Sequence, residues 1–335
     1  MKKTFTKEHL RVLAQDHGVI YMNDPVLALD AQPALTTVPN TGVLAQFLNY
    51  VDPEVVNIIF TPMNATRIAP ERKTGNWVTM SAQFPIAEAV GHVKGYGDFD
   101  NGGESSANFN WENRQSFHYQ TITQAGEREI EMMGQGKIDL VSQLNKSSIL
   151  TLNKFQNKTY FFGVDGLANY GFLNDPDLNP SITAGVKAAG GTSWSDATPK
   201  EIYDDIKAMF IQLVTQLGGN VERDAAMVFS CSPEKMVHMR EANEVMGNTA
   251  ENMIKNAFPN LEFESAPEYK TDTGDISQLR VKDVDGIETA YCSFTEKMRA
   301  HPVIPDVSSW KQKKSGGTWG AIIRVPAAMV TMIGI

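Results

Sequence analysis

The sequence has little cysteine and little positive charge for its length. Its 335 residues include two cysteines, Cys231 and Cys292, which stand far apart. No Cys-x-x-Cys pair is present, which excludes zinc-knuckle and thioredoxin-type sites. Lysine and arginine number 30 against 39 aspartates and glutamates, so the formal net charge is −9. A protein whose main task is to grip nucleic acid usually carries the opposite balance.

Long hydrophobic runs are also missing. No stretch reaches about 18 consecutive apolar residues, and the most apolar part, residues 321–335, is interrupted by Arg324 and Pro326. The Met-Lys-Lys start precedes charged residues and no apolar segment, so we expect no secretory signal and no membrane partner. The composition, 42% hydrophobic and 21% charged, is ordinary for a globular protein. The length predicts about two domains.

Residues 1–50 have the character of an arm. Leu10, Leu13 and Ile20 form a short helical stripe, and the following stretch contains Pro33 and Pro39 with few periodic apolar residues. Such a segment becomes ordered mainly by lying on another surface. A frayed terminus and an arm that ties one subunit to another both remain open.

Residues 77–118 are the most unusual stretch. Trp77 to Phe84 has the pattern of a strand, and aromatic residues then recur at odd positions, namely Phe109, Trp111, Phe117 and Tyr119. This alternation predicts a second strand, and the turn-rich residues 95–104 predict a tip between the two. An isolated hairpin of this length is marginal in water. We therefore expect a neighbour, such as another copy of the chain, to cover it.

Helical spacing of apolar residues continues from about residue 126 to residue 157. The recurring side chains include Ile130, Leu140, Leu144, Leu152 and Phe155. The pattern predicts one long helix of roughly 45 Å. Gly134 and Gly136 weaken this prediction in its first third.

Residues 163–296 are predicted to form a compact α/β domain. Thr198 and Pro199 provide a cap and a first turn for a helix that Gly218 and Gly219 end. A short apolar strand at residues 225–229 precedes a second helix that begins at Ser232-Pro233. Further strands are expected near residues 261–264 and 288–294, and the tail from residue 299 is β-like.

The residues that could take part in catalysis or bind a ligand do not form a convincing catalytic, cofactor or metal site. Gly95-Tyr-Gly-Asp98 lacks the third glycine of a dinucleotide motif, and residues 98–104 lack the spacing of a calcium loop. Cys231 precedes a predicted helix near His238, but a small buried residue explains it more simply. The six histidines are scattered. The basic cluster at residues 311–314 is interpreted as a solvated face.

The order of the parts resembles one family, the major capsid proteins of tailed double-stranded DNA bacteriophages with the Hong Kong 97 fold. Local sequence agrees with this resemblance. The passage from Phe161 to Pro176, Phe-Phe-Gly-Val-Asp-Gly-Leu-Ala-Asn-Tyr-Gly-Phe-Leu-Asn-Asp-Pro, is similar to the Gly…Gly-Leu-Leu-Asn passage after the family's long helix. Residues Val228 to Glu234 resemble the strand-to-helix step of its axial domain. Here Phe172-Leu173 stands in place of the usual Leu-Leu.

The resemblance implies an α+β fold with an N-terminal arm, an extended hairpin, a peripheral domain with a long spine helix, and an axial domain. The implied hairpin residues at a subunit interface are Trp77, Phe84, Lys94, Phe109, Trp111 and Phe117. The implied spine residues are Ile130, Leu140, Leu144, Leu152 and Phe155. The corresponding ranges are 1–50 for the arm, 77–118 for the hairpin, 163–296 for the axial domain, and 51–76, 119–162 and 297–335 for the peripheral domain.

The resemblance further implies a structural role without catalysis or cofactors. The chain would assemble through pentamers and hexamers into an icosahedral shell in the host cytoplasm and reside in the virion. Portal, scaffolding and decoration proteins are possible partners, and the acidic chain would contact packaged DNA only weakly. Some relatives cross-link a loop lysine to a neighbour's asparagine. Lys94 lies near the tip here, but no partner set is evident, so we expect no cross-link.

Two alternatives stay open at this point. An encapsulin-type bacterial nanocompartment would use the same fold, although the long hairpin and the arm favour a phage. A soluble α/β enzyme would use residues 163–296 and would require a pocket with convergent titratable groups. The sequence offers no such group.

Overall fold

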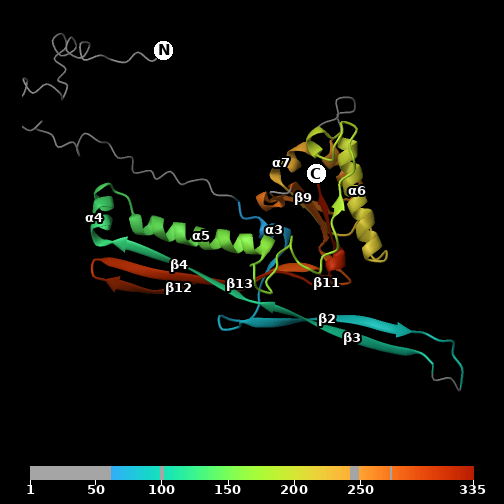
Figure 1. Ribbon diagram of the computed structural model, residues 1–335, viewed down its shortest axis with the longest axis horizontal. Helices are drawn as coiled ribbons and strands as arrows, with labels where there is room; N and C mark the ends of the chain where they lie inside the picture. The colour runs from blue at the N-terminus through green and yellow to red at the C-terminus, as the bar shows by residue number, and fades with distance from the viewer. Residues whose placement is uncertain (1–61, 99–101, 242–248, 272–273) are drawn as a thin grey trace, which may run out of the picture. The chain divides into compact units, whose positions relative to one another are not determined.

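The computed structural model describes residues 62–98, 102–241, 249–271 and 274–335 (Figure 1). The arm expected over residues 1–50 and the start of the expected 51–76 segment lie outside the described residues. The described residues belong to one compact unit, which spans residues 56–335. They form a four-stranded sheet, a six-stranded sheet and two two-stranded ribbons. No helix among them is long and apolar enough to cross a membrane.

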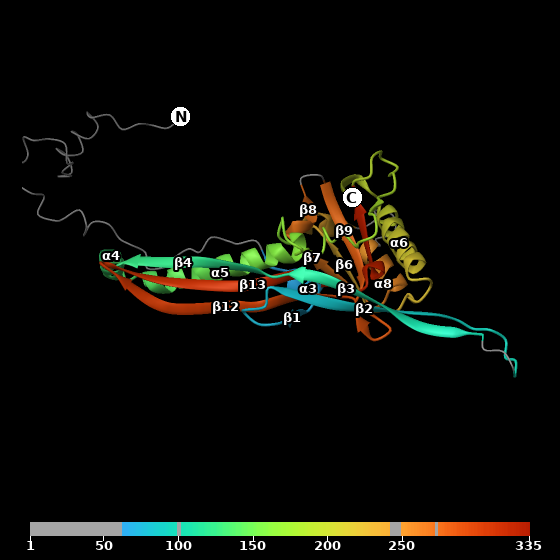
Figure 2. The ribbon, with the colours of Figure 1, turned by 60° about the horizontal axis from the view of Figure 1, so that its bottom comes forward.

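The four-stranded sheet is built around a long antiparallel pair. Strands β12 and β13 pair from Ala290 opposite Ile323 to Asp306 opposite Ser309, and Figure 2 shows β12, β13 and β4 side by side. Several register shifts interrupt the β12–β13 pairing, which bends such strands and increases their twist. In sheet order, the strands are β1 (Glu71–Lys73), β12 (Ala290–Asp306), β13 (Ser309–Ile323) and β4 (Phe117–Gly126).

Two helices replace the single long helix that the periodicity predicted. Helix α4 covers Glu127–Gln135 and α5 covers Leu140–Phe162. The chain breaks between them because glycine has low helix propensity and because Asp139 caps α5 by accepting a hydrogen bond from the Ser142 amide at 3.0 Å. Lys137 in this break adopts a φ of 59°. Helix α5 packs on β4 and β13, and the short helix α3 (Ala65–Ile68) contacts it.

The six-stranded sheet carries the α/β part of the chain. Helix α6 (Pro199–Gln216) begins with the expected cap, in which Thr198 and Glu201 exchange hydrogen bonds, and it packs against strand β14 and helix α8. The other helices are α7 (Pro233–His238) and α8 (Ala250–Ala257). The strands run β5 (Ile182–Thr183), β14 (Met329–Ile333), β9 (Gly274–Val281), β6 (Met227–Cys231) and β7 (Leu261–Ser265), with β8 (Lys270–Thr271) paired to β9.

Short elements complete the described residues. The strands β10 and β11 form a small ribbon, and three short 3-10 helices connect larger elements. Their bounds are β10 (Asp283–Val284), β11 (Ile287–Glu288), η1 (Trp194–Asp196), η2 (Pro267–Tyr269) and η3 (Pro326–Ala328).

The domain boundaries differ from those expected near the C-terminus. The four-stranded sheet already begins at Ala290, before the expected boundary at residue 296. Strand β14, expected to return to the peripheral domain, instead lies between β5 and β9 in the six-stranded sheet. Its apolar residues fill the core beneath α6. A short apolar run does not itself indicate which of two sheets it joins.

Candidate functional site

The hairpin is formed by two strands of 12 residues, β2 (Ser81–His92) and β3 (Glu104–Gln115). Its antiparallel register runs from Ser81 opposite Gln115 to His92 opposite Glu104, and neither strand pairs with another sheet. The ribbon was therefore predicted correctly as an element, but its strands are displaced from the predicted ones. Both Figures 1 and 2 show it leaving the sheet that contains β4.

The root of the ribbon is packed against the protein, whereas its outer part exposes large apolar side chains. Near the root, Phe84 packs against a cluster that contains Trp319, Tyr291 and Ile322. Further out, Phe109 is 64% exposed, and beyond the end of β2 Val93 is 99% exposed. Large apolar side chains on a solvent face point to an interaction surface. The ribbon therefore has an anchored root and an outer part that offers apolar area.

The root is held by the loop that follows α5. The Gln115 amide donates to the Ala168 carbonyl at 2.8 Å. The Asn169 side chain donates from Nδ2 to the Gln115 carbonyl at 3.0 Å and to the Thr318 carbonyl at 3.1 Å. One buried amide group thus connects β3, β13 and the loop. This loop belongs to the passage that resembled the capsid family, although sequence reasoning assigned no role to Asn169.

Two glycines allow this loop to fold back on the end of α5. Gly163 ends the helix with a φ of 63°, and a Cβ atom there would lie 2.2 Å from the Asn169 carbonyl oxygen. A Cβ atom on Gly171 would lie 2.2 Å from the Phe161 carbonyl carbon. Only glycine permits both approaches. The glycine spacing of the passage therefore has a physical cause, since it places the loop against the hairpin root.

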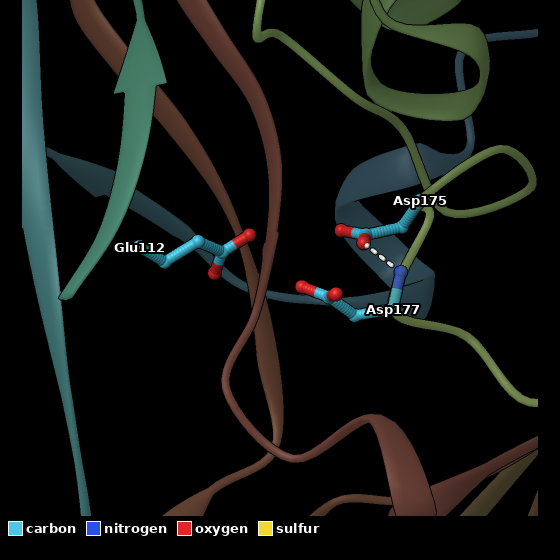
Figure 3. A group of neighbouring side chains, drawn as sticks. All are labelled: Glu112, Asp175 and Asp177. Carbon is cyan, nitrogen blue, oxygen red and sulfur yellow. Dashed lines mark hydrogen bonds between the residues drawn. The ribbon is translucent and has the colours of Figure 1, made fainter. Parts of the chain in front are cut away.

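Four charged side chains meet at the root. The buried guanidinium of Arg114 contacts the carboxylate of Glu112 on the same strand and lies 2.7 Å from Asp175 Oδ2. Asp177 adds a third carboxylate, and one carboxylate oxygen from each of the three acids lies within 4.8 Å of the other two. Figure 3 shows the three carboxyl groups directed toward one another, with the Asp177 amide donating to Asp175 Oδ1 at 3.1 Å. Tyr170 covers the guanidinium, at 4.6 Å from ring centre to Cζ.

This arrangement shifts the ionisation of the acids. Burial raises the pKa of Glu112 to about 7, and the Asp175 and Asp177 charges add to this rise while Arg114 opposes it. Burial also raises the pKa of Asp175, against the opposing effect of Arg114. Sequence reasoning missed this group because its members are far apart in the chain and two of them sit in an irregular loop.

The predicted interface residues divide between the hairpin and its surroundings. Phe84, Phe109 and Trp111 lie on the ribbon, and Lys94 is exposed just beyond the end of β2. Trp77 precedes β2, and its ring meets the His118 ring edge to face, with 4.6 Å between the ring centres. Phe117 was predicted to lie in the hairpin, but it belongs to β4. Ser116 separates the two strands, so the aromatic alternation continued across a strand boundary.

The predicted spine residues also divide between two elements. Ile130 belongs to α4, so its assignment to the long helix is wrong, whereas the other predicted spine residues, Leu140, Leu144, Leu152 and Phe155, lie in α5. Leu152 is buried. Phe155 contacts Tyr119 of β4 at 4.8 Å and Phe117 at 5.9 Å between ring centres. Helix α5 is therefore fixed to the sheet strand that continues from the hairpin.

Two further sequence interpretations change in the structure. Lys314 is buried and donates to Asn145 Oδ1 and Ser148 Oγ, each at 2.6 Å, so the basic cluster is not wholly a solvated face. Cys231 is buried, and this burial raises its pKa. A raised thiol pKa disfavours the thiolate that a nucleophile requires.

Comparison with solved structures establishes the fold. A chain from the capsid of Myoviridae phage XM1 has a TM-score of 0.73 at 14% identity, covering 88% of this chain and 99% of that chain. A chain from the capsid of the native GTA particle has a TM-score of 0.61 at 11% identity, covering 88% of this chain and 97% of that chain. A chain from Mycobacterium phage Ogopogo has a TM-score of 0.57 at 10% identity, covering 87% of this chain and 99% of that chain. The expected Hong Kong 97-like α+β fold is thereby confirmed.

Comparison of sequences establishes the family. A search of curated proteins found no match. The profile of the family described as Pa193 gp26 major capsid protein matches residues 34–334. The solved capsid structures share the fold over most of the chain, in agreement with this match. The chain therefore belongs to the Pa193 gp26 major capsid protein family, and its role is a structural one in the capsid of a virion.

Proposed function

We propose that this chain assembles through pentamers and hexamers into an icosahedral shell around the double-stranded DNA genome of a tailed phage. We further propose that the β2–β3 hairpin is the arm by which each subunit covers a neighbouring copy. Helix α5 and the four-stranded sheet then act as the support from which the hairpin extends, and the six-stranded sheet forms the axial domain.

The single observation that carries the proposal is the contrast between the two ends of the hairpin. Its root packs on Trp319 and is hydrogen-bonded through Asn169, whereas Phe109 and Val90 further out are exposed. A two-stranded ribbon gains little stability by itself in water. Cover by a second subunit would bury this apolar area and order the ribbon.

The physics of assembly favours such a hairpin. Obligate interfaces bury about 2,000–5,000 Å² or more, and closed symmetry repeats each contact many times. An extended ribbon provides a large contact area from few residues. Loss of one apolar contact per subunit is therefore multiplied across the shell.

We infer the remaining partners from the net charge of the chain and from the role of its family. The net charge of −9 favours confinement of the genome by the shell over tight binding of DNA by this chain. Assembly would take place in the host cytoplasm, with portal, scaffolding and decoration proteins as further partners. The N-terminal arm would tie subunits together. We propose no catalytic activity and no covalent cross-link.

Substitution of one exposed aromatic residue tests the hairpin's role. In Phe109→Ser the outer ribbon loses apolar area, and we expect fewer and less heat-resistant particles while the unassembled subunit melts as before. Asn113→Ser is the matched control, since residues 109 and 113 lie on the same face of β3 and Asn113 is polar. Particles of unchanged yield and heat resistance in Phe109→Ser would refute the intersubunit role.

A further inference from the structure

The charges at the hairpin root do not balance when every acid is ionised. Glu112, Asp175 and Asp177 supply three carboxylates, and Arg114 supplies the one guanidinium that pairs with Glu112 and Asp175. The charged groups acting on Glu112 come from β3 and from the loop after α5, and they are Arg114, Asp175 and Asp177. Its cross-strand partner on β2 is the uncharged Phe84.

The surroundings make this excess of negative charge costly. The Glu112 side chain is 17% exposed and that of Asp175 is 1% exposed. Because water screens charges poorly at such sites, repulsion between neighbouring carboxylates is strong. A proton shared by two carboxyl groups removes one charge and adds one hydrogen bond between them.

The geometry identifies the pair that shares the proton. Asp175 accepts from Arg114 and from the Asp177 amide, so its oxygens already have donors. Asp177 is the most exposed of the three acids, and one of its carboxylate oxygens lies within 4.8 Å of a Glu112 carboxylate oxygen. A hydrogen bond between these two side chains is among the causes that raise the pKa of Glu112. Two carboxyl groups form such a bond only when one of them is protonated.

We propose that Glu112 and Asp177 form a proton-dependent clasp that fastens the hairpin root to the loop after α5 and loosens when the proton leaves. The clasp joins two segments that are distant in sequence. The same two segments, β3 and the loop after α5, are joined by the backbone bond from the Gln115 amide to the Ala168 carbonyl, which measures 2.8 Å. Opening of the root is therefore coupled to a change in protonation.

The direction of the pH effect follows from linkage. The closed root holds the Glu112 proton with a pKa of about 7, against an ordinary value of 4.5. Below pH 4.5 both open and closed roots carry the proton, so the clasp contributes fully. Between pH 4.5 and about pH 7 the closed root binds more protons than the open one. The equilibrium constant for opening the root therefore rises by up to about tenfold per pH unit. Above about pH 7 the effect levels off.

A consequence for assembly rests on the proposed function of the hairpin. If the ribbon covers a neighbour, the protonation of Glu112 sets how freely it can swing about its root. The test below uses the unassembled subunit, so its result does not depend on whether the hairpin lies at an interface.

Hydrogen exchange at the Gln115 amide measures opening of the root. Protection, corrected for the intrinsic exchange rate, should fall by at least tenfold between pH 5 and pH 7.5 in the native chain. Glu112→Gln keeps the side chain uncharged, so we expect its protection to be high and nearly constant over this range. Glu104→Gln removes an exposed carboxylate from the other end of β3 and should behave like the native chain.

One further variant completes the test. Asp177→Asn removes the repelling charge and should shift the fall in protection to lower pH. Constant protection in the native chain, or an equal fall in Glu112→Gln, would overturn the clasp.

Discussion

The guanidinium of Arg114 lies 2.7 Å from the carboxylate of Asp175, and both side chains are almost completely buried. This ion pair connects strand β3 of the hairpin to the loop that follows helix α5. The ring of Tyr170 covers the guanidinium. The ribbon is therefore fixed at its root by charge, aromatic cover and hydrogen bonds, while its outer part is exposed.

Removal of Arg114 should destabilise the subunit strongly. In Arg114→Met the half-buried Glu112 and the buried Asp175 lose their cation, and breaking a buried pair in this way costs about 3–5 kcal/mol. Urea unfolding at pH 8 measures the loss. Arg72→Met, which breaks the more exposed pair with Glu288, should cost less than about 1 kcal/mol.

The double variant Arg114→Met/Asp175→Asn extends this comparison. It removes both members of the pair, so its cost should be less than the sum of the two single substitutions. Additive costs, or a loss in Arg114→Met no larger than that in Arg72→Met, would show that the pair does not fasten the root.

The loop after α5 should tolerate no side chain at Gly171. A Cβ atom there would meet the backbone of Phe161 at 2.2 Å, so Gly171→Ala must displace the loop and should cost at least roughly 1–3 kcal/mol. Gly134→Ala in α4 meets no atom within 4 Å and should be neutral or stabilising by up to about 1 kcal/mol. Thermal unfolding of both variants checks the contrast, which equal melting temperatures would contradict.

Lys314 should make the stability of the subunit depend on pH. Burial lowers the pKa of Lys314 below the ordinary 10.5, so the folded state binds this proton less tightly than the unfolded state. The free energy of unfolding therefore rises as pH increases from the lowered pKa toward 10.5. Lys314→Met should reduce this rise, whereas Lys313→Met should retain it. Denaturant unfolding between pH 7 and pH 10 compares them, and identical pH profiles would contradict the assignment.

The shell should be held together without covalent bonds between subunits. Lys94 is exposed near the tip of the ribbon, and the expectation rests on the sequence, in which we recognise no isopeptide-forming set of lysine, asparagine and acid. Mature particles boiled in denaturant should migrate as one band near 37.0 kDa. A ladder of bands that resists reductant would contradict this expectation, and Lys94→Ala would then test the lysine.

The elements with strong local signals could be predicted from the sequence. Period-two alternation indicated the ribbon, and Thr198 with Pro199 marked the start of α6, where the capping bonds are present. The order of the parts, together with the passage from Phe161 to Pro176, indicated the capsid fold.

The boundaries and the charged root could not be predicted in the same way. The alternation that reaches Phe117 does not reveal that Ser116 ends one strand pairing and begins another. The sequence also cannot show that Glu112 meets Asp177, because their approach depends on the turn made at Gly163 and Gly171. The burial of Lys314 could not be predicted either, because a run of basic residues does not show which lysine a helix covers.

Shortening the hairpin tests the central claim most directly. Ala89 and Ala107 are paired opposite each other, so residues 90–106 can be replaced by Asn-Gly, a dipeptide that closes tight hairpins. Sedimentation velocity, with negative-stain microscopy of the fastest boundary, then compares this variant with the native chain under identical assembly conditions. We expect megadalton shells from the native chain and a folded subunit of low mass from the variant. Shells of equal yield and heat resistance from both chains would contradict the claim that the hairpin joins the subunits.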